Sequence, residues 1–252
     1  MRVYRAEAIV LRRWHIGETD KSVTFLTRSH GKLGAIAKGA RRPTSRIAGA
    51  TELFTHCRVL LAVGRNLDVL TQCETLEPFL NLRAELDRFA AASYMAELTD
   101  TMVDERMPVP ALFDILLDAL RGLDAGRMPH LVVRAFELYA AREQGYEPSL
   151  SRCVRCRAEV PASQDSAFSA ALGGVVCGRC TPQVSDAETI NPGVLLLARG
   201  LLSGAAGADI ERFCTRENAV TLGRLMRRHI EYRTDRRVKA AEFMDALTFA
   251  PP

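Results

Sequence analysis

Hydrophobic and polar residues alternate along the first 78 residues with the two-residue period of β-strands. Glycine-containing turns separate the apolar runs, and Gly64-Arg65-Asn66 has the composition of a hairpin turn. Short strands so closely spaced are typical of a small closed barrel such as an OB-fold, although an SH3-like barrel fits the same pattern. The predicted strands cover residues 6–14, 22–27, 33–38, 53–63 and 67–74.

Beyond Pro78 the apolar residues recur every three or four positions, which predicts amphipathic α-helices. The first begins near Leu82 and runs for roughly 25 residues, with its acidic side chains, including Asp100, on the solvent side. Asn191 and Pro192 suit the N-cap and the first position of a later helix. Further helices are predicted at about residues 112–123, 130–144, 191–202, 216–232 and 239–247.

These patterns together predict an α+β protein with several domains. We assign residues 1–78 to an N-terminal OB-fold barrel, residues 79–150 and 184–252 to a helical domain, and residues 151–183 to an insert in that domain. No apolar run approaches the ~18 residues that a membrane span needs, and the N-terminus lacks the pattern of a secretory signal. We therefore expect a cytoplasmic protein without a membrane partner.

The insert contains two Cys-x-x-Cys pairs, Cys153 with Cys156 and Cys177 with Cys180. Each pair lets two thiolates reach one ion from a tight turn, and two pairs complete a tetrahedral site of four sulfurs. Such a site leaves no position for water, so we expect a structural Zn²⁺, with a rubredoxin-like iron site as the alternative. The remaining cysteines are scattered and are expected to be small core residues: Cys57, Cys73 and Cys214.

Positive charge is concentrated at the N-terminal end of the chain. The net charge is only +4, but residues 1–50 carry +8 and the remaining 202 residues −4, which indicates a polyanionic partner for the barrel. The candidate nucleic-acid contacts of the barrel are Arg12, Arg13, Lys21, Lys32, Lys38, Arg41, Arg42 and Arg46. A second basic cluster near the C-terminus includes Arg227, Arg228, Arg233, Arg236 and Arg237.

No arrangement of residues in the sequence indicates catalysis. The phosphate-cradling motifs G-x-x-x-x-G-K-[ST] and G-x-G-x-x-G are absent, as are the H-E-x-x-H and G-x-S-x-G patterns of hydrolases. We therefore predict no catalytic residues and no use of ATP. Two other functions stay open on these grounds: a zinc-ribbon protein that binds RNA or regulates transcription, and a zinc-dependent nuclease.

Several local motifs resemble the RecO family of bacterial recombination mediators. They are Gly17-Glu18 with Asp20, Thr27 followed by Gly31 and Gly34, and above all Ala37-Lys38-Gly39-Ala40-Arg41. The order of the cysteine pairs, with Gly173-Gly174 before the second pair, also agrees. The resemblance covers nearly the whole chain, and family members differ most in the cysteine segment.

The resemblance implies a fold and a set of activities. It implies an N-terminal OB-fold, a helical domain and a zinc-binding insert, with Lys38 and Arg41 part of the basic surface. It also implies binding of single- and double-stranded DNA, annealing of complementary strands without ATP, and a bacterial, nucleoid-associated location. The partners that it implies are RecR and the single-stranded DNA-binding protein, with RecF as a further candidate. No local motif assigns residues to these protein partners.

Overall fold

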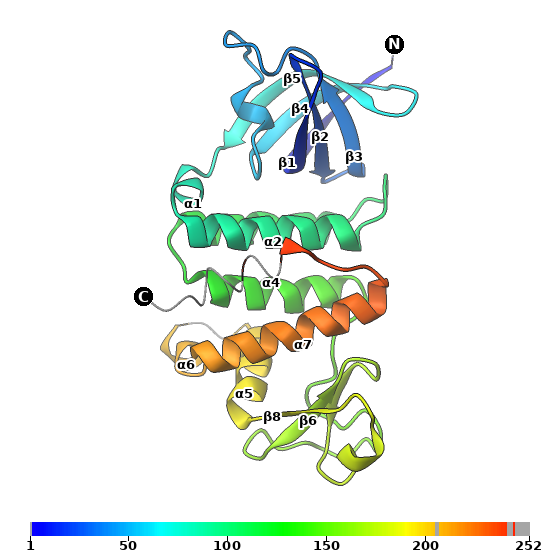
Figure 1. The fold of residues 1–252 in the computed structure, drawn as a ribbon, viewed down its shortest axis with the longest axis vertical. Coiled ribbons are helices and arrows are strands. Elements are labelled where there is room, and N and C mark those ends of the chain that lie inside the picture. The colour runs from blue at the N-terminus through cyan, green and yellow to red at the C-terminus, as the bar shows by residue number, and fades with distance from the viewer. Residues whose placement is uncertain (1, 205–206, 241–243, 245–252) are drawn as a thin grey trace. The chain divides into compact units, whose positions relative to one another are not determined.

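The computed structural model describes residues 2–204, 207–240 and 244 of the chain (Figure 1). The chain divides into two compact units, Met1–Arg127 and Met128–Pro252. Most of the helix predicted at residues 239–247 lies outside the described residues. Among the described residues, no helix combines the length and apolar character that crossing a bilayer requires.

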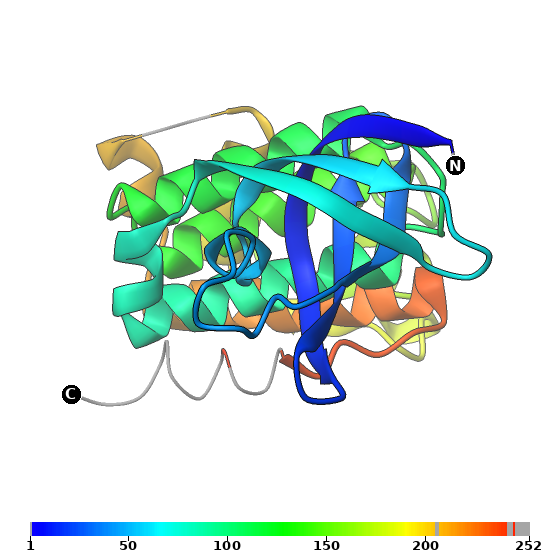
Figure 2. The same cartoon turned by 90° about the horizontal axis from the view of Figure 1, so that it is seen from above.

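The first unit begins with a closed five-stranded barrel, seen from above in Figure 2. Neighbouring strands follow the order β1-β2-β3-β5-β4, and β4 returns to pair with β1. All pairs are antiparallel except β3 with β5, as in an OB-fold, so the predicted fold class is confirmed. The strands are β1 (Val3–Ile16), β2 (Asp20–Thr27), β3 (Gly31–Ala37), β4 (His56–Ala62) and β5 (Asp68–Glu77), with the 3-10 helix η1 (Gly49–Thr51) between β3 and β4.

Alternation along the strands fills the barrel with small and apolar side chains. Val10 pairs with Phe25, and Phe25 pairs with Leu33, so that all three point into the core. A β-bulge between Val10 and Arg12 adds one residue to β1. Beyond the bulge Arg13 pairs with the core residue Val23, so Arg12 and Trp14 point outward.

Three helices complete the first unit: α1 (Leu80–Ala84), α2 (Leu86–Met102) and α3 (Pro110–Asp124). The single long helix predicted from Leu82 is wrong, because Glu85 has an extended backbone and divides it. Contacts of α1 with the barrel favour this break in the helix. The Arg83 guanidinium donates 2.6 Å hydrogen bonds to the Leu53 carbonyl and the Thr55 hydroxyl beside the barrel. Propensity along the sequence carries no signal of such partners.

The connection between α2 and α3 is fastened to the barrel along β3. The Arg106 N–H donates to the Lys32 carbonyl at 2.8 Å, and its guanidinium pairs with the buried Asp68 carboxylate at 3.1 Å. Asp68 also accepts the Tyr4 hydroxyl, and burial, followed by this hydrogen bond, raises the pKa of Tyr4 to about 12. Backbone of this connection approaches Gly31 so closely that only a glycine fits there.

The second unit combines packed helices with a small three-stranded sheet. Asn191 caps α5 as predicted, accepting the Val194 N–H at 3.0 Å. His229 of α7 is buried against the Tyr146 carbonyl, and burial lowers its pKa, so the ring is neutral at pH 7. The elements are α4 (Pro129–Glu143), β6 (Ser166–Ser169), β7 (Gly174–Val176), η2 (Thr181–Gln183), β8 (Glu188–Ile190), α5 (Pro192–Leu202), α6 (Ala208–Glu211) and α7 (Arg216–Thr234).

An ion pair lies inside the helical core of this unit. Arg134 and Glu137 are 2% and 0% exposed, and their side chains pair at 3.1 Å on successive turns of α4. The Arg134 guanidinium also donates to the Ala219 carbonyl of α7 at 3.4 Å. Gly223 leaves the space that this guanidinium fills, since a Cβ there would lie 1.2 Å from an Arg134 nitrogen. A buried charge of this kind is tolerated only when it is paired.

Gly31 allows a test of the contact between β3 and the α2–α3 connection. A Cβ on Gly31 would lie 2.1 Å from the Met107 carbonyl oxygen, and its φ of +69° adds left-handed strain. We expect Gly31→Ala to lower the free energy of unfolding of the first unit by about 2–4 kcal/mol. Gly17→Ala is the matched control, because Gly17 also has positive φ but nothing lies within 4 Å of its Cβ position. Its expected loss is about 1 kcal/mol.

Urea unfolding followed by the fluorescence of Trp14, the single tryptophan of the chain, reports on this unit. Equal losses in the two glycine variants would show that the Met107 contact does not hold the connection in place.

Candidate nucleic-acid interface and metal centre

The loop of residues 38–46, called the basic loop here, leaves β3 through a turn at Gly39. Gly39 has φ +65°, and its N–H donates to the Asp20 carboxylate at 2.8 Å. This backbone hydrogen bond, helped by the Thr19 hydroxyl, lowers the pKa of Asp20. Asp20 therefore stays ionised and fixes the start of the basic loop against β2. The sequence motif Gly17-Glu18-Thr19-Asp20 indicated a turn but not this contact.

Two further hydrogen bonds join the basic loop to the β1–β2 turn. The Arg41 N–H donates to the Thr19 carbonyl at 2.9 Å, and the Arg41 guanidinium donates to the Gly17 carbonyl at 3.1 Å. Figure 2 shows this turn, in dark blue, projecting from the barrel. The four predicted contacts on the basic loop are all exposed to solvent at this position: Lys38, Arg41, Arg42 and Arg46.

Two other predicted contacts, Arg13 and Lys21, pair with one carboxylate, that of Glu52. Lys21 has a side chain only 6% exposed and pairs with Glu52 at 2.8 Å. Arg13 is half-buried and pairs with the same carboxylate at 3.0 Å. The sequence pattern places Lys21 beside the exposed arginines but carries no signal of Glu52, which lies 31 residues away along the chain. A phosphate would have to displace Glu52 to reach either side chain.

Arg12 and Lys32 share a second carboxylate, that of Asp100 on α2. The Asp100 side chain is 15% exposed, and its oxygens lie 2.9 Å from Arg12 and 3.1 Å from Lys32. The predicted solvent-facing position of Asp100 is therefore wrong: the residue faces the barrel and connects α2 to β1 and β3. Arg12 is more than half exposed, whereas the Lys32 side chain is 12% exposed.

The second basic cluster lies on α7 and just beyond its end. Arg228 pairs with Glu188 at 3.0 Å, and Arg227 is half-buried. Arg233 donates to the Ala171 carbonyl at 3.4 Å. The cluster thus contributes contacts to the sheet of its own unit, and its last two members, Arg236 and Arg237, are exposed beyond the end of the helix.

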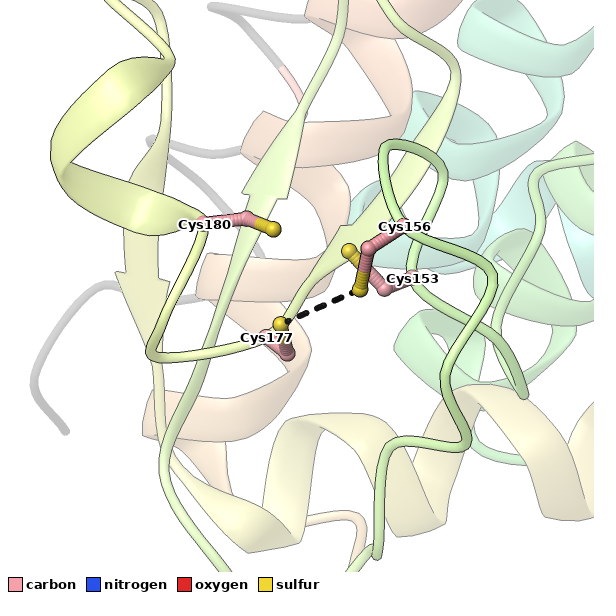
Figure 3. A group of neighbouring side chains, drawn as sticks. All are labelled: Cys153, Cys156, Cys177 and Cys180. Carbon is pink, nitrogen blue, oxygen red and sulfur yellow. Dashed lines mark hydrogen bonds between the residues drawn. The ribbon is translucent and has the colours of Figure 1, made fainter.

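The four cysteines of the insert converge from two loops (Figure 3). Their sulfurs all lie within 4.8 Å of one another, and those of Cys156 and Cys177 are 3.7 Å apart. The Cys177–Cys180 loop is closed by a hydrogen bond from the Cys180 N–H to the Cys177 carbonyl at 2.9 Å. Sequence spacing and structure therefore agree on one cluster of four sulfur ligands.

The surroundings of the cluster shift the pKa values of its thiols in opposite directions. Burial disfavours ionisation of Cys153, but backbone N–H groups, among them that of Cys177, outweigh it and bring its pKa down to about 6. A backbone hydrogen bond from Ala158 lowers the pKa of Cys156. Burial and its neighbours raise the pKa of Cys180 to about 12. A metal ion bound here would displace the remaining thiol protons, and Zn²⁺ with four sulfur ligands fits this donor set.

The remaining cysteines lie outside this cluster: Cys57 and Cys214 are buried, as predicted for core residues, whereas Cys73 is half-buried against the barrel core. Cys57 is fully buried in the barrel, and its neighbour Cys73, together with burial, raises the pKa of its thiol. Cys214 is buried in the second unit, where burial raises its pKa to about 11. Neutral, buried thiols of this kind are chemically inert.

Comparison with known families accounts for almost the whole chain. Residues 1–79 match the family model described as "Recombination protein O N terminal". Residues 83–242 match the model described as "Recombination protein O C terminal". The boundary between the two matches falls where the barrel gives way to α1.

Curated relatives match over the same length. A protein of Pelotomaculum thermopropionicum named "DNA repair protein RecO" is 40% identical over 253 residues, covering 100% of this chain and 97% of the relative. A Symbiobacterium thermophilum protein of the same name is 40% identical, covering 99% of this chain and 100% of the relative. A Roseiflexus protein with that name is 45% identical over 179 residues, covering 71% of this chain and 62% of the relative.

The metal centre is tested by counting the ions bound to the purified chain. We expect about one zinc ion per chain by mass spectrometry, and Cys156→Ser to remove most of it because a ligand is lost. Cys214→Ser is the matched control, since this buried cysteine lies outside the cluster and its loss should leave the zinc content unchanged.

A chelator should lower the melting temperature of the second unit, because metal binding contributes to its folding free energy. Metal-free protein with an unchanged melting temperature would contradict a structural zinc.

Proposed function

The chain belongs to the RecO family of DNA repair proteins, and from this premise we propose that it is a non-catalytic recombination mediator that holds DNA on its barrel. In this proposal it binds single- and double-stranded DNA and anneals complementary strands without ATP. It acts with RecR and the single-stranded DNA-binding protein in recombinational repair, with RecF as a further candidate partner.

The observation that carries the proposal is the exposed charge of the basic loop. Its four cations stand on one loop beside the β1–β2 turn of an OB-fold: Lys38, Arg41, Arg42 and Arg46. OB-folds bind oligonucleotides on strands β2 and β3 and on the β1–β2 loop, and the basic loop begins at the end of β3 and is hydrogen-bonded to the β1–β2 turn. Guanidinium groups suit phosphate oxygens because they donate in pairs. We leave Lys21 and Lys32 out of this surface, since each is buried against a carboxylate.

Holding the backbone suits an annealing protein. Contacts to phosphates position a strand without engaging its base edges, so the bases stay free to pair with a second strand. If the four exposed cations neutralise four phosphates of a single strand, log affinity should fall with log salt at a slope of about −2.8. The zinc centre, with its four sulfur ligands, supports folding of the second unit in this proposal and has no role in chemistry.

Charge reversal on the basic loop tests the proposed surface. We expect Lys38→Glu combined with Arg41→Glu to lower affinity for a single-stranded oligonucleotide at least about tenfold, because two phosphate contacts become repulsive. The salt slope should fall to about −1.4. Fluorescence anisotropy of a labelled oligonucleotide measures both quantities, and circular dichroism checks that the fold is kept.

The matched control reverses the same number of charges elsewhere. Arg236→Glu combined with Arg237→Glu changes the net charge equally in the second basic cluster and should alter affinity less than about twofold. The same variants are compared in annealing of complementary oligonucleotides without ATP, with and without the single-stranded DNA-binding protein. A larger loss in the control would move the DNA surface to α7, and cleavage of the DNA would contradict a non-catalytic role.

A further inference from the structure

Trp14 is a large aromatic side chain left open to solvent on the barrel. It is 46% exposed, whereas Phe25 and Phe54 are 0% and 1% exposed. Tyr4 is half-buried and donates to Asp68. Among the phenylalanine, tyrosine and tryptophan residues of positions 2–77, all of which are described, Trp14 is the one that solvent reaches freely. Trp14 is therefore the aromatic side chain of these strands that a ligand can reach.

Strand register places Trp14 on the outer face of the sheet, near the end of β1 and the β1–β2 turn. Trp14 pairs with Ser22, Ser22 with Ile36, and Ile36 with Val69, so these four residues form a row across β1, β2, β3 and β5. Ser22 is 1% exposed, and Ile36 and Val69 are half-buried. Trp14 is therefore the most exposed member of this row.

Helices cover one part of this outer face but leave Trp14 exposed. Ile9 and Leu26, which pair with each other on the same face, are fully buried because α2 contacts β1 and α3 contacts β2. Asp100 marks the limit of this cover, since it pairs with Arg12. Trp14 lies two residues beyond Arg12 and is exposed.

One cation lies against the exposed indole, and others follow in the adjoining segments of the chain. The Arg12 guanidinium lies 5.7 Å from the centroid of the Trp14 ring, within the range of a cation–π contact, and its pairing with Asp100 restricts its movement. Lys38 follows Ile36 by two residues and begins the exposed basic loop, and Arg41 is bound to the neighbouring β1–β2 turn. Two of the acidic groups nearby are engaged: Asp100 by Arg12 and Lys32, and Asp20 by the Gly39 N–H.

We propose that Trp14 stacks against an unpaired base of a single-stranded DNA held by the basic loop. The inference rests on the proposed DNA binding and adds a contact that phosphates alone do not provide. An indole ring stacks on any base, because every base has a π-face. A base inside a duplex is already stacked on both sides, so this contact favours single strands and is given up when the strands pair.

The chain's single tryptophan makes the test direct, since all tryptophan fluorescence comes from this position. The full chain is titrated with an oligo(dT) of about 20 nucleotides, and with an abasic strand of the same phosphate count. We expect quenching by oligo(dT) and binding of the abasic strand without comparable quenching. Binding is also measured by fluorescence anisotropy of labelled strands. We expect Trp14→Ala to weaken oligo(dT) binding at least about fivefold and Trp14→Phe to retain most of the affinity. Neither variant should change the affinity for a duplex or for the abasic strand more than about twofold.

Tyr232→Ala is the matched control, because Tyr232 is also an exposed aromatic residue, at 60%, but lies on α7. Its removal should leave oligo(dT) affinity unchanged. If the wild-type chain binds oligo(dT) without quenching and Trp14→Ala binds it equally well, the stacking contact is refuted while the proposed DNA binding stands. If the wild-type chain binds neither strand, the proposed function fails and this inference with it.

Discussion

The Asp100 carboxylate determines which part of the barrel is free to act. It accepts Arg12 from β1 and Lys32 from β3, and it is only 15% exposed, so the two ion pairs are less screened than pairs at an open surface. Arg106 adds a second ion pair, with the buried Asp68 carboxylate, and Met107 meets Gly31 directly. Helices α2 and α3 therefore cover one part of the outer face of β1 and β2, and Trp14 stays exposed.

The basic residues of the barrel fall into two groups, those paired with carboxylates and those exposed to solvent. The basic residues of β1, β2 and β3 largely neutralise carboxylates that hold the unit together, whereas those of the basic loop face solvent. The boundary between the two sets lies at Gly39. The Asp20 carboxylate accepts the Gly39 N–H and so fixes the turn at which the basic loop begins. In the second unit, four cysteine sulfurs lie within 4.8 Å of one another and could hold a metal ion.

Patterns with a local physical cause were readable from the sequence. Alternating apolar residues gave the five strands, Asn191 gave the start of α5, and the spacing of Cys153, Cys156, Cys177 and Cys180 gave the sulfur cluster. The features that could not be predicted from the sequence depend on contacts between residues far apart along the chain. Lys21 is buried because of Glu52, Asp100 faces the barrel because of Arg12 and Lys32, and the long helix breaks at Glu85 where Arg83 reaches the barrel.

The central claim is that the open, positively charged part of the barrel contacts DNA. Amide hydrogen exchange of the full chain, with and without a single-stranded oligonucleotide, locates the contact without altering any residue. We expect slower exchange in the β1–β2 turn and in the basic loop, residues 38–46, and little change on α7. Protection confined to the cysteine insert or to α7 and the residues after it, with the barrel unaffected, would contradict the account.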